Sequence, residues 1–232
     1  MVPTLPSYWL PRPSTKLTED LRAAFDTVLE KAIERGADAP MAYTLNAPKW
    51  QFLCYAAEER SLALHGSLNP DIAEFEPRQA DDLRKFGAQK AVYASSDGIW
   101  PMYFAIVDRL RHPMSIMNAC IRIEMPDGVF NPPLYFFSIP KHLIHLHPYT
   151  DGVVYLFPRE TFIVDQPMPF GPAKVHPAQL ASLVPVKPLA KLAVSPGDFP
   201  FLAQMRAHDD NDLNTYARAL NEGLPWPGDE SA

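Results

Sequence analysis

An α+β fold is predicted by three features of the sequence. Apolar residues repeat at helical spacing within residues 1–60. From residue 61 onward the apolar runs are short and are bounded by turn residues, as in small sheets. Proline is frequent, with 26 residues among 232, and it cannot donate a hydrogen bond within a helix or a sheet. Many short elements are therefore expected instead of a helical bundle.

Three helices are expected in the first half of the chain. The first has Thr18 or Thr15 as its cap and ends at Gly36. Its apolar positions are Leu17, Leu21, Phe25, Val28, Leu29 and Ile33. A second helix is expected over about 48–60 and a third over 100–110, each with a proline in its first turn.

Short strands and a polar loop account for most of the remaining chain. The expected strands are 61–65, 91–95, 120–125, 134–139, 142–147, 153–157, 183–186 and 189–194. Residues 69–89 are polar and proline-broken, so they are expected to be mostly loop. A weak helix is expected over 213–220 in the tail.

The expected organisation has three parts. Residues 1–60 form an N-terminal arm and helices packed on the core, 61–202 form the core itself, and 203–232 form a C-terminal tail with the weak helix. Residues 1–15 are proline-rich and read as an extended arm.

Composition narrows the classes of function. The net charge of −6 argues against a broad phosphate-binding surface, which needs clustered Lys and Arg. Cys54 and Cys120 form no C-x-x-C pair and are expected to be buried small hydrophobes. The N-terminus lacks the basic start and apolar run of a signal peptide, and no window approaches 18 uninterrupted apolar residues. We therefore expect a cytoplasmic protein with no membrane partner.

Two segments together indicate a ligand site. Residues 64–67 read Leu-His-Gly-Ser at a strand end, and residues 92–96 read Val-Tyr-Ala-Ser-Ser on a later strand, with Phe104 eleven positions after Tyr93. Glycine lets a ligand approach the main chain, and one residue's N–H and C=O can satisfy a carboxamide. Two aromatic rings can cover the faces of a flat ring. The alternative is that Tyr93 and Phe104 are core residues, since a lone His-Gly-Ser is a weak signal.

These segments resemble the diphtheria-toxin-like and poly(ADP-ribose)-polymerase-like branch of the ADP-ribosyltransferases. The matching residues are His65-Gly66 and Tyr93-Ala94-Ser95, with Phe104 in the place of a second aromatic that is usually Tyr. The resemblance extends over roughly 50–200, but only these motifs are specific. It implies a pair of small antiparallel sheets with an N-terminal helical segment.

The resemblance also implies a site for NAD, used as a substrate. His65 would bond the ribose, and Gly66, beside Ser67, would hold the nicotinamide amide. Tyr93 and Phe104 would sandwich the ring. Ser95 would support the site from its strand, next to the small residue Ala94. ADP-ribose would pass to an unknown protein or nucleic-acid acceptor.

One position departs from that branch, whose active members usually present a Glu from a late strand. A carboxylate stabilises the positive charge that develops on the sugar as nicotinamide leaves. In the late segment Gln179 best fits this position; a neutral amide can orient the ribose but cannot offset a full positive charge. Glu160 could substitute if the sheet turned it inward.

Two alternatives therefore remain open. The protein could be a catalytically weak or inactive module that acts by binding NAD or a partner. It could also resemble the RNA 2′-phosphotransferases, with Arg111, Arg122 and Lys141 as basic side chains, although the acidic charge balance disfavours this.

Other motifs carry less weight. His145 and His147 would face one side of a strand and could hold zinc, but no Cys, Asp or Glu is adjacent, so no metal is expected. The sequence contains no phosphate loop, no dinucleotide-binding glycine motif and no G-x-S-x-G elbow.

Overall fold

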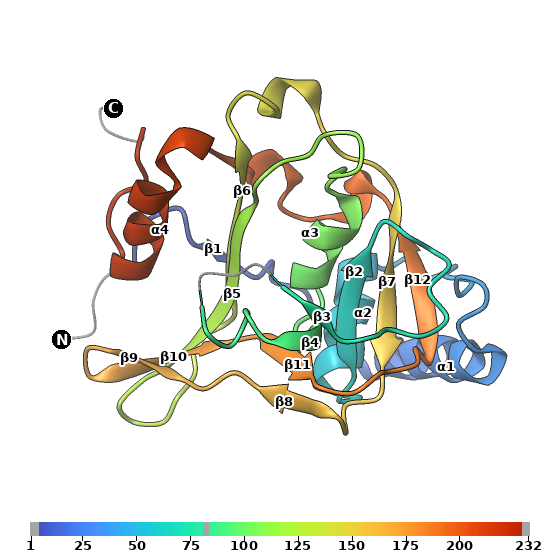
Figure 1. Ribbon diagram of the computed structural model, residues 1–232. Coiled ribbons are helices and arrows are strands. Elements are labelled where there is room, and N and C mark those ends of the chain that lie inside the picture. The colour runs from blue at the N-terminus through green and yellow to red at the C-terminus, as the bar shows by residue number, and fades with distance from the viewer. Residues whose placement is uncertain (1–4, 81–83, 229–232) are drawn as a thin grey trace.

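The computed structural model of the protein is a mixed α+β structure (Figure 1). The described residues are 5–80 and 84–228, and within them the chain forms four α-helices and two sheets. The ends of the expected arm and tail, residues 1–4 and 229–232, lie outside the described residues, as do residues 81–83 of the expected loop.

The first sheet has six strands. Its order is β1 (Leu10–Pro11), β6 (Leu134–Pro140), β5 (Met117–Glu124), β10 (Ala173–Pro177) and β9 (Met168–Phe170), with β13 (Arg206–His208) also on β6. All pairs are antiparallel except β13 with β6. The expected arm and tail therefore each contribute a strand to this sheet.

The second sheet has seven strands, all paired antiparallel. Its order is β12 (Ala190–Val194), β7 (Gly152–Phe157), β2 (Ala63–Ser67), β4 (Lys90–Ser95), β11 (Gln179–Ser182) and β8 (Phe162–Val164), with β3 (Arg78–Gln79) also on β4. The expected pair of antiparallel sheets is thus present.

The helices occupy three places around the sheets. They are α1 (Glu19–Arg35), α2 (Lys49–Glu58), α3 (Trp100–Ile106) and α4 (Leu213–Glu222). Figure 1 shows α3 between the two sheets, α1 and α2 beside the second sheet, and α4 beside the first. Four short 3₁₀ turns are Ile144–Leu146, Pro196–Asp198, Leu202–Gln204 and Asp210–Asp212. No helix in the described residues combines the length and the apolar character needed to cross a membrane.

The ends of α1 follow the sequence prediction. The Thr18 hydroxyl accepts a hydrogen bond from the Leu21 main-chain N–H at 3.3 Å, so Thr18 is the cap. Gly36 has a φ of 80°, a conformation that favours glycine, and its N–H bonds the last turn.

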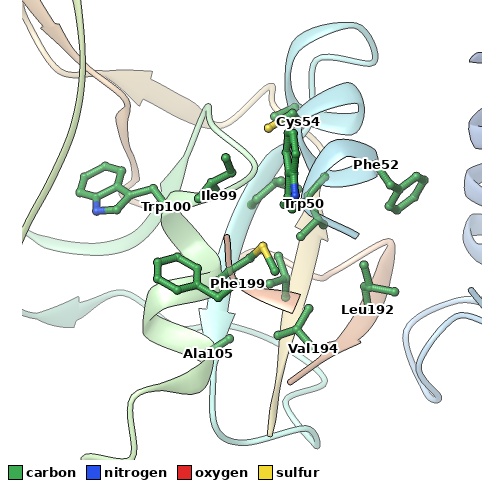
Figure 2. Packing of buried hydrophobic residues seen from close by; sticks show 14 of the residues in the cluster. Trp50, Phe52, Cys54, Ile99, Trp100, Ala105, Leu192, Val194 and Phe199 are labelled. Carbon is green, nitrogen blue, oxygen red and sulfur yellow. The ribbon is translucent and has the colours of Figure 1, made fainter. Parts of the chain in front are cut away.

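The largest core lies between α2, α3 and both sheets. Figure 2 shows side chains of α2, α3 and β12 around this core, with Phe52 and Trp100 pointing outward on opposite sides. The Phe52 ring contacts Phe25 of α1 with centroids 5.5 Å apart, so α1 is held by aromatic packing.

Three glycines allow the helices to lie against neighbouring backbone. A Cβ atom on Gly66 would stand 1.8 Å from the Pro101 carbonyl oxygen, and one on Gly152 would stand 1.9 Å from the Ala105 carbonyl oxygen. One on Gly98 would overlap the backbone of α2. Helix α3 therefore rests directly on β2 and β7.

Two expected strands are wrong. Residues 142–147 form a turn and a 3₁₀ turn, and His147 has a φ of 46°. This segment lies between Pro140 and Pro148 and buries only Leu143, so it lacks the alternating buried face that stabilises a strand. The late strand is 179–182 instead of 183–186, where Pro185 cannot donate to a ladder.

The two sheets join next to Gln179. The chain leaves the first sheet at Pro177 and enters the second at Gln179, with Ala178 between them. The Ala178 N–H donates to the Cys120 carbonyl, and its carbonyl accepts from the Ser96 N–H, both at 2.9 Å. This junction fixes the position of β11 beside β4.

Candidate functional site

The three segments that the sequence singled out lie on three adjacent strands. Leu64 of β2 is paired with Ser95 of β4, and Ser95 is paired with Gln179 of β11. Residues paired in this way share one face of a sheet. The order β2-β4-β11 therefore makes the His-Gly, Tyr-Ala-Ser and Gln179 segments neighbours. The side chains of Tyr93, Ser95 and Gln179 share one face, and that of His65, which follows Leu64, leaves the sheet on the other face, with Ala94.

Strands β2 and β4 pair at Leu64–Ser95 and at no other position among the described residues. Beyond it, β3 pairs with β4 instead. The imidazole of His65 contacts the edge of β4, with Nδ1 2.6 Å from the Tyr93 carbonyl oxygen. The separated strand edges at His65 and Tyr93 are the centre of the candidate site.

The contact of His65 fixes its tautomer. A carbonyl oxygen only accepts hydrogen bonds, so Nδ1 carries the proton and donates it. Burial lowers the pKa of His65, and the charge of Arg109 lowers it further, although the bond to Tyr93 opposes this. The neutral ring therefore presents a lone pair on Nε2, which can accept a hydroxyl proton.

Aromatic side chains support the His65 ring. Its centroid lies 5.0 Å from that of Phe75 in an edge-to-face arrangement and 6.4 Å from that of Phe157. Phe75 lies in the expected loop and is held by main-chain bonds to Val186. The orientation of His65 is thus set by packing as well as by Tyr93.

Tyr93 is half-buried and bonded to the segment before its strand. Its hydroxyl accepts from the Gln89 N–H at 2.9 Å and lies within hydrogen-bond distance of the Phe86 and Gln89 carbonyls. The side chain shares the face of Ser95, two residues along the strand. Residues 84–89 are therefore attached to this face of β4.

Gly66 and Ser67 have local roles in the structure. The Cα of Gly66 faces α3, whose backbone occupies the space that a side chain would need. The Ser67 hydroxyl accepts from the Asn69 N–H at 3.1 Å and stabilises the turn after β2. On this face of the sheet, the group that lies close to Gly66 is therefore the backbone of α3.

Ala94 and Ser95 lie on opposite faces of β4. Ala94 belongs to the apolar cluster around Phe157. Ser95 is buried, and its hydroxyl accepts from the Asp97 N–H at 2.9 Å. This bond stabilises the connection between β4 and α3.

Phe104 is half-buried on α3, and its ring contacts come from the same helix. The centroids of Trp100 and Tyr103 lie 6.1 and 5.5 Å from its own. Among the described side chains, no ring contact joins Phe104 to Tyr93. The structure therefore does not bring the two expected aromatics into direct contact.

Gln179 lies within the group of strands, and Glu160 does not. Gln179 is half-buried opposite Ser95. Glu160 is exposed in the turn before β8, beyond the Ser182–Phe162 pair at the far end of β11.

A carboxylate beside Gln179 was missed by the sequence reasoning. The Asp165 N–H donates to the Gln179 carbonyl at 3.2 Å, so Asp165, one residue beyond the end of β8, lies next to Gln179. Its side chain is 5% exposed and forms an ion pair with Arg84. No local sequence pattern reveals the contact between Asp165 and Gln179, because it depends on the register between β8 and β11.

A buried network around Asp97 was also missed. One carboxylate oxygen accepts from Arg12 at 2.5 Å and from Tyr135 at 2.6 Å, and the other accepts from the main-chain N–H groups of Ile99 and Trp100, both at 2.8 Å. Burial opposes the charge of Arg12, but Glu58 and Asp97 outweigh it and raise the pKa of Arg12. An Asp just before a proline-initiated helix is a capping signal that could have identified Asp97.

A cavity of about 370 Å³ lies away from these strands, between the arm and α2. Its walls include Arg12, Trp50, Cys54, Glu58 and Pro133. On this wall Glu58 forms ion pairs with Arg12 and with Arg122, each at 2.7 Å.

The described residues contain no group of three or more His, Cys, Asp or Glu side chains arranged to hold a metal. His142, His145 and His147 are exposed on the turn that replaces the expected strand. The two-histidine ladder therefore does not form.

No protein-family model, no curated protein and no solved structure matches the chain.

Proposed function

We propose that the protein binds NAD where β2 and β4 separate, and that it transfers ADP-ribose from NAD to an acceptor. The observation that carries this proposal is that His65, Tyr93 and Gln179 lie on three adjacent strands, where the first two strands part and the His65 ring reaches the Tyr93 carbonyl. These are the positions that the resemblance assigned to NAD.

The polar groups at this place suit a nucleoside. Nε2 of His65 is an acceptor, which fits a ribose hydroxyl. Separated strand edges offer main-chain N–H and C=O groups, which fit the carboxamide of nicotinamide. The Tyr93 ring adds a flat surface for stacking.

The reaction separates the nicotinamide from the ribose. The C1′–N bond breaks, its electron pair stays on nicotinamide, and positive charge develops on the sugar. Water or an acceptor hydroxyl then attacks C1′ and releases its proton to solvent. Gln179 can orient the ribose, but its amide carries no charge to stabilise the cation.

The neutral side chain of Gln179 favours a second candidate, a module that binds NAD without breaking it. The two functions differ in one product. An enzyme releases nicotinamide from NAD. A binding module leaves NAD intact, and the bound NAD raises the temperature of its thermal unfolding midpoint.

The test is incubation with NAD, with nicotinamide measured by chromatography and binding measured by thermal shift. His65→Ala is expected to abolish both signals. The control is His176→Ala, on β10 of the other sheet, where the imidazole contacts Glu124; it is expected to leave both signals unchanged. Tyr93→Ala is expected to raise the Kd for NAD about 2- to 10-fold, because a stacked ring contributes about 0.5–1.5 kcal/mol. A wild-type protein that shows neither binding nor release contradicts the proposal.

A further inference from the structure

The cavity between the arm and α2 has the size of a small-molecule site. Its volume of about 370 Å³ lies within the range of about 300–1,000 Å³ that is usual for such sites. The arm wall is fixed at both ends, because the Arg12 N–H donates to the Pro133 carbonyl at 3.1 Å and the Gln51 side chain donates to the Lys16 carbonyl at 3.4 Å. The protein's own contacts therefore hold the cavity open.

The Arg12 guanidinium has one free nitrogen at this cavity. Its Nε donates to the Tyr135 hydroxyl at 2.9 Å, and its Nη2 contacts Asp97 at 2.5 Å and Glu58 at 2.7 Å. Among the residues that the structure describes, Nη1 has no hydrogen-bond partner. Because Arg12 lines the cavity and its side chain is 15% exposed, the two N–H groups of Nη1 can donate to a ligand.

Glu58 supplies a free acceptor on the same wall. Its Oε1 lies 2.7 Å from Nη2 of Arg12 and 2.7 Å from Nη2 of Arg122. Within the described part of the chain, its Oε2 has no partner, and the side chain is 33% exposed. The cavity thus offers a free donor nitrogen and a free acceptor oxygen from two side chains that contact each other.

The charges around these two groups balance. Two guanidinium groups contact two carboxylates, and the four residues are Arg12, Arg122, Asp97 and Glu58. Glu59, which also lines the cavity, is paired with Arg22. An ion in the cavity would add an uncompensated charge to this balanced and partly buried group, which is unfavourable. An uncharged ligand avoids that cost.

We propose that this cavity binds a small uncharged molecule that carries a carboxamide or lactam group. The carbonyl oxygen of the ligand accepts from Nη1 of Arg12, and its N–H donates to Oε2 of Glu58, so both halves of the amide are satisfied. The apolar part of the ligand packs against Leu17, Trp50 and Pro133. This site is separate from the NAD site proposed above and does not depend on it.

The first test uses three probes that share one hydrocarbon ring and differ in charge. They are cyclohexanecarboxamide, which is uncharged, cyclohexanecarboxylate, an anion, and cyclohexanecarboxamidine, a cation. The amide is expected to shift the NMR signal of the Trp50 indole N–H in a saturable way, with a Kd on the order of 1 mM, and to leave that of Trp226 unchanged. Both ions are expected to bind at least about tenfold more weakly.

Two substitutions change the charge balance in opposite directions. Glu58→Gln leaves an excess positive charge and is expected to favour the carboxylate over the amide at least about threefold more than the wild type does. Arg122→Gln leaves an excess negative charge and is expected to favour the amidine by a similar factor. The control is Glu34→Gln, at an exposed position of α1, which is expected to keep all three Kd values within about twofold.

The outcomes decide between this site and its alternatives. His65→Ala is expected to bind the amide as the wild type does, which separates the cavity from the proposed NAD site. Arg122 lies outside the cavity wall and is 42% exposed, so Arg122→Gln keeps the test possible if Glu58→Gln does not fold. The proposal is overturned if the amide causes no saturable shift at Trp50, or if either ion binds the wild type as tightly as the amide does. An unchanged preference among the probes in both charge variants would also overturn it.

Discussion

The Asp97 carboxylate is held by groups that come from distant parts of the chain. Arg12 belongs to the arm, Tyr135 to β6, and the N–H groups of Ile99 and Trp100 to the start of α3. The side chain is buried, so its charge depends on these partners. A buried ion pair that loses one member leaves an uncompensated charge or unsatisfied donors.

Replacement of Asp97 by Ala is therefore expected to lower the free energy of unfolding by about 3–5 kcal/mol, because Arg12 and the first turn of α3 both lose their acceptor. Urea unfolding measures the change. Asp151→Ala, at an exposed position, is the control and is expected to stay within about 0.5 kcal/mol of the wild type. Equal effects of the two substitutions would contradict this role for Asp97.

His208 gives the protein a dependence on pH. It is fully buried, with Nδ1 2.7 Å from the Ser138 hydroxyl and Nε2 2.8 Å from the Ser115 hydroxyl. Burial lowers the pKa of His208, an effect that Asp210 and Asp209 partly oppose. The unfolded chain therefore takes up this proton at a higher pH than the folded chain does, so folding stability is lost as the pH falls below about 6.5.

His208→Gln is expected to lower the unfolding midpoint at every pH but to reduce its change between about pH 7.5 and pH 5.5, because one group that gains a proton on unfolding is gone. Thermal unfolding at the two pH values measures this difference. An unchanged pH dependence in the variant would show that His208 does not titrate as described.

At the scale of elements, α3 links the two sheets. It lies on β2 and β7 at Gly66 and Gly152, and its Tyr103 hydroxyl donates to the Ser138 carbonyl of β6 at 2.9 Å. Because Gly66 follows His65, the packing of α3 also fixes the strand end at the candidate site. A change at Gly66 therefore affects stability and the site together.

Gly66→Ala is expected to destabilise the protein by about 1–3 kcal/mol or more, since the new methyl group meets the α3 backbone. Gly197→Ala is the matched control: the nearest atom to its Cβ would be the Ser195 hydroxyl oxygen at 3.9 Å, so no loss is expected. Chemical denaturation compares the two. A Gly66→Ala protein as stable as the wild type would show that α3 does not lie this close to β2.

At the scale of the whole molecule, the two ends of the chain complete the first sheet. β1 and β13 both pair with β6, and the Tyr8 hydroxyl donates to the Ala219 carbonyl at 3.0 Å. The Tyr8 ring also contacts Trp226, with centroids 5.7 Å apart. Arm and tail are thus packed against each other as well as against the sheet.

The sequence was informative where structure depends on neighbouring residues. The cap at Thr18, the end at Gly36 and the strand around Tyr93 followed from local patterns. The strand predicted over 142–147 was wrong because alternating histidines give the same sequence pattern as a strand, although almost no side chain there is buried. The Asp165–Gln179 contact could not be predicted from the sequence, because it depends on a strand register that is set by long-range packing.

Thiol reactivity tests whether the molecule unfolds as one unit. Cys54 and Cys120 are free and buried, and burial raises the pKa of both thiols. Both are expected to react with iodoacetamide at one common rate, set by global unfolding, and rapidly in denaturant. Mass spectrometry follows the two sites. Fast alkylation of one cysteine in the native protein would contradict a single cooperative unit.

The place of NAD binding is tested most directly by the nitrogen NMR signals of the histidine rings. In the free protein, His65 is expected to show a protonated Nδ1 and an unprotonated Nε2. Addition of NAD is expected to shift the His65 Nε2 signal in a saturable way and to leave His176 unchanged. Saturable binding of NAD with no change at His65, or no binding of NAD at all, would contradict a site between β2 and β4.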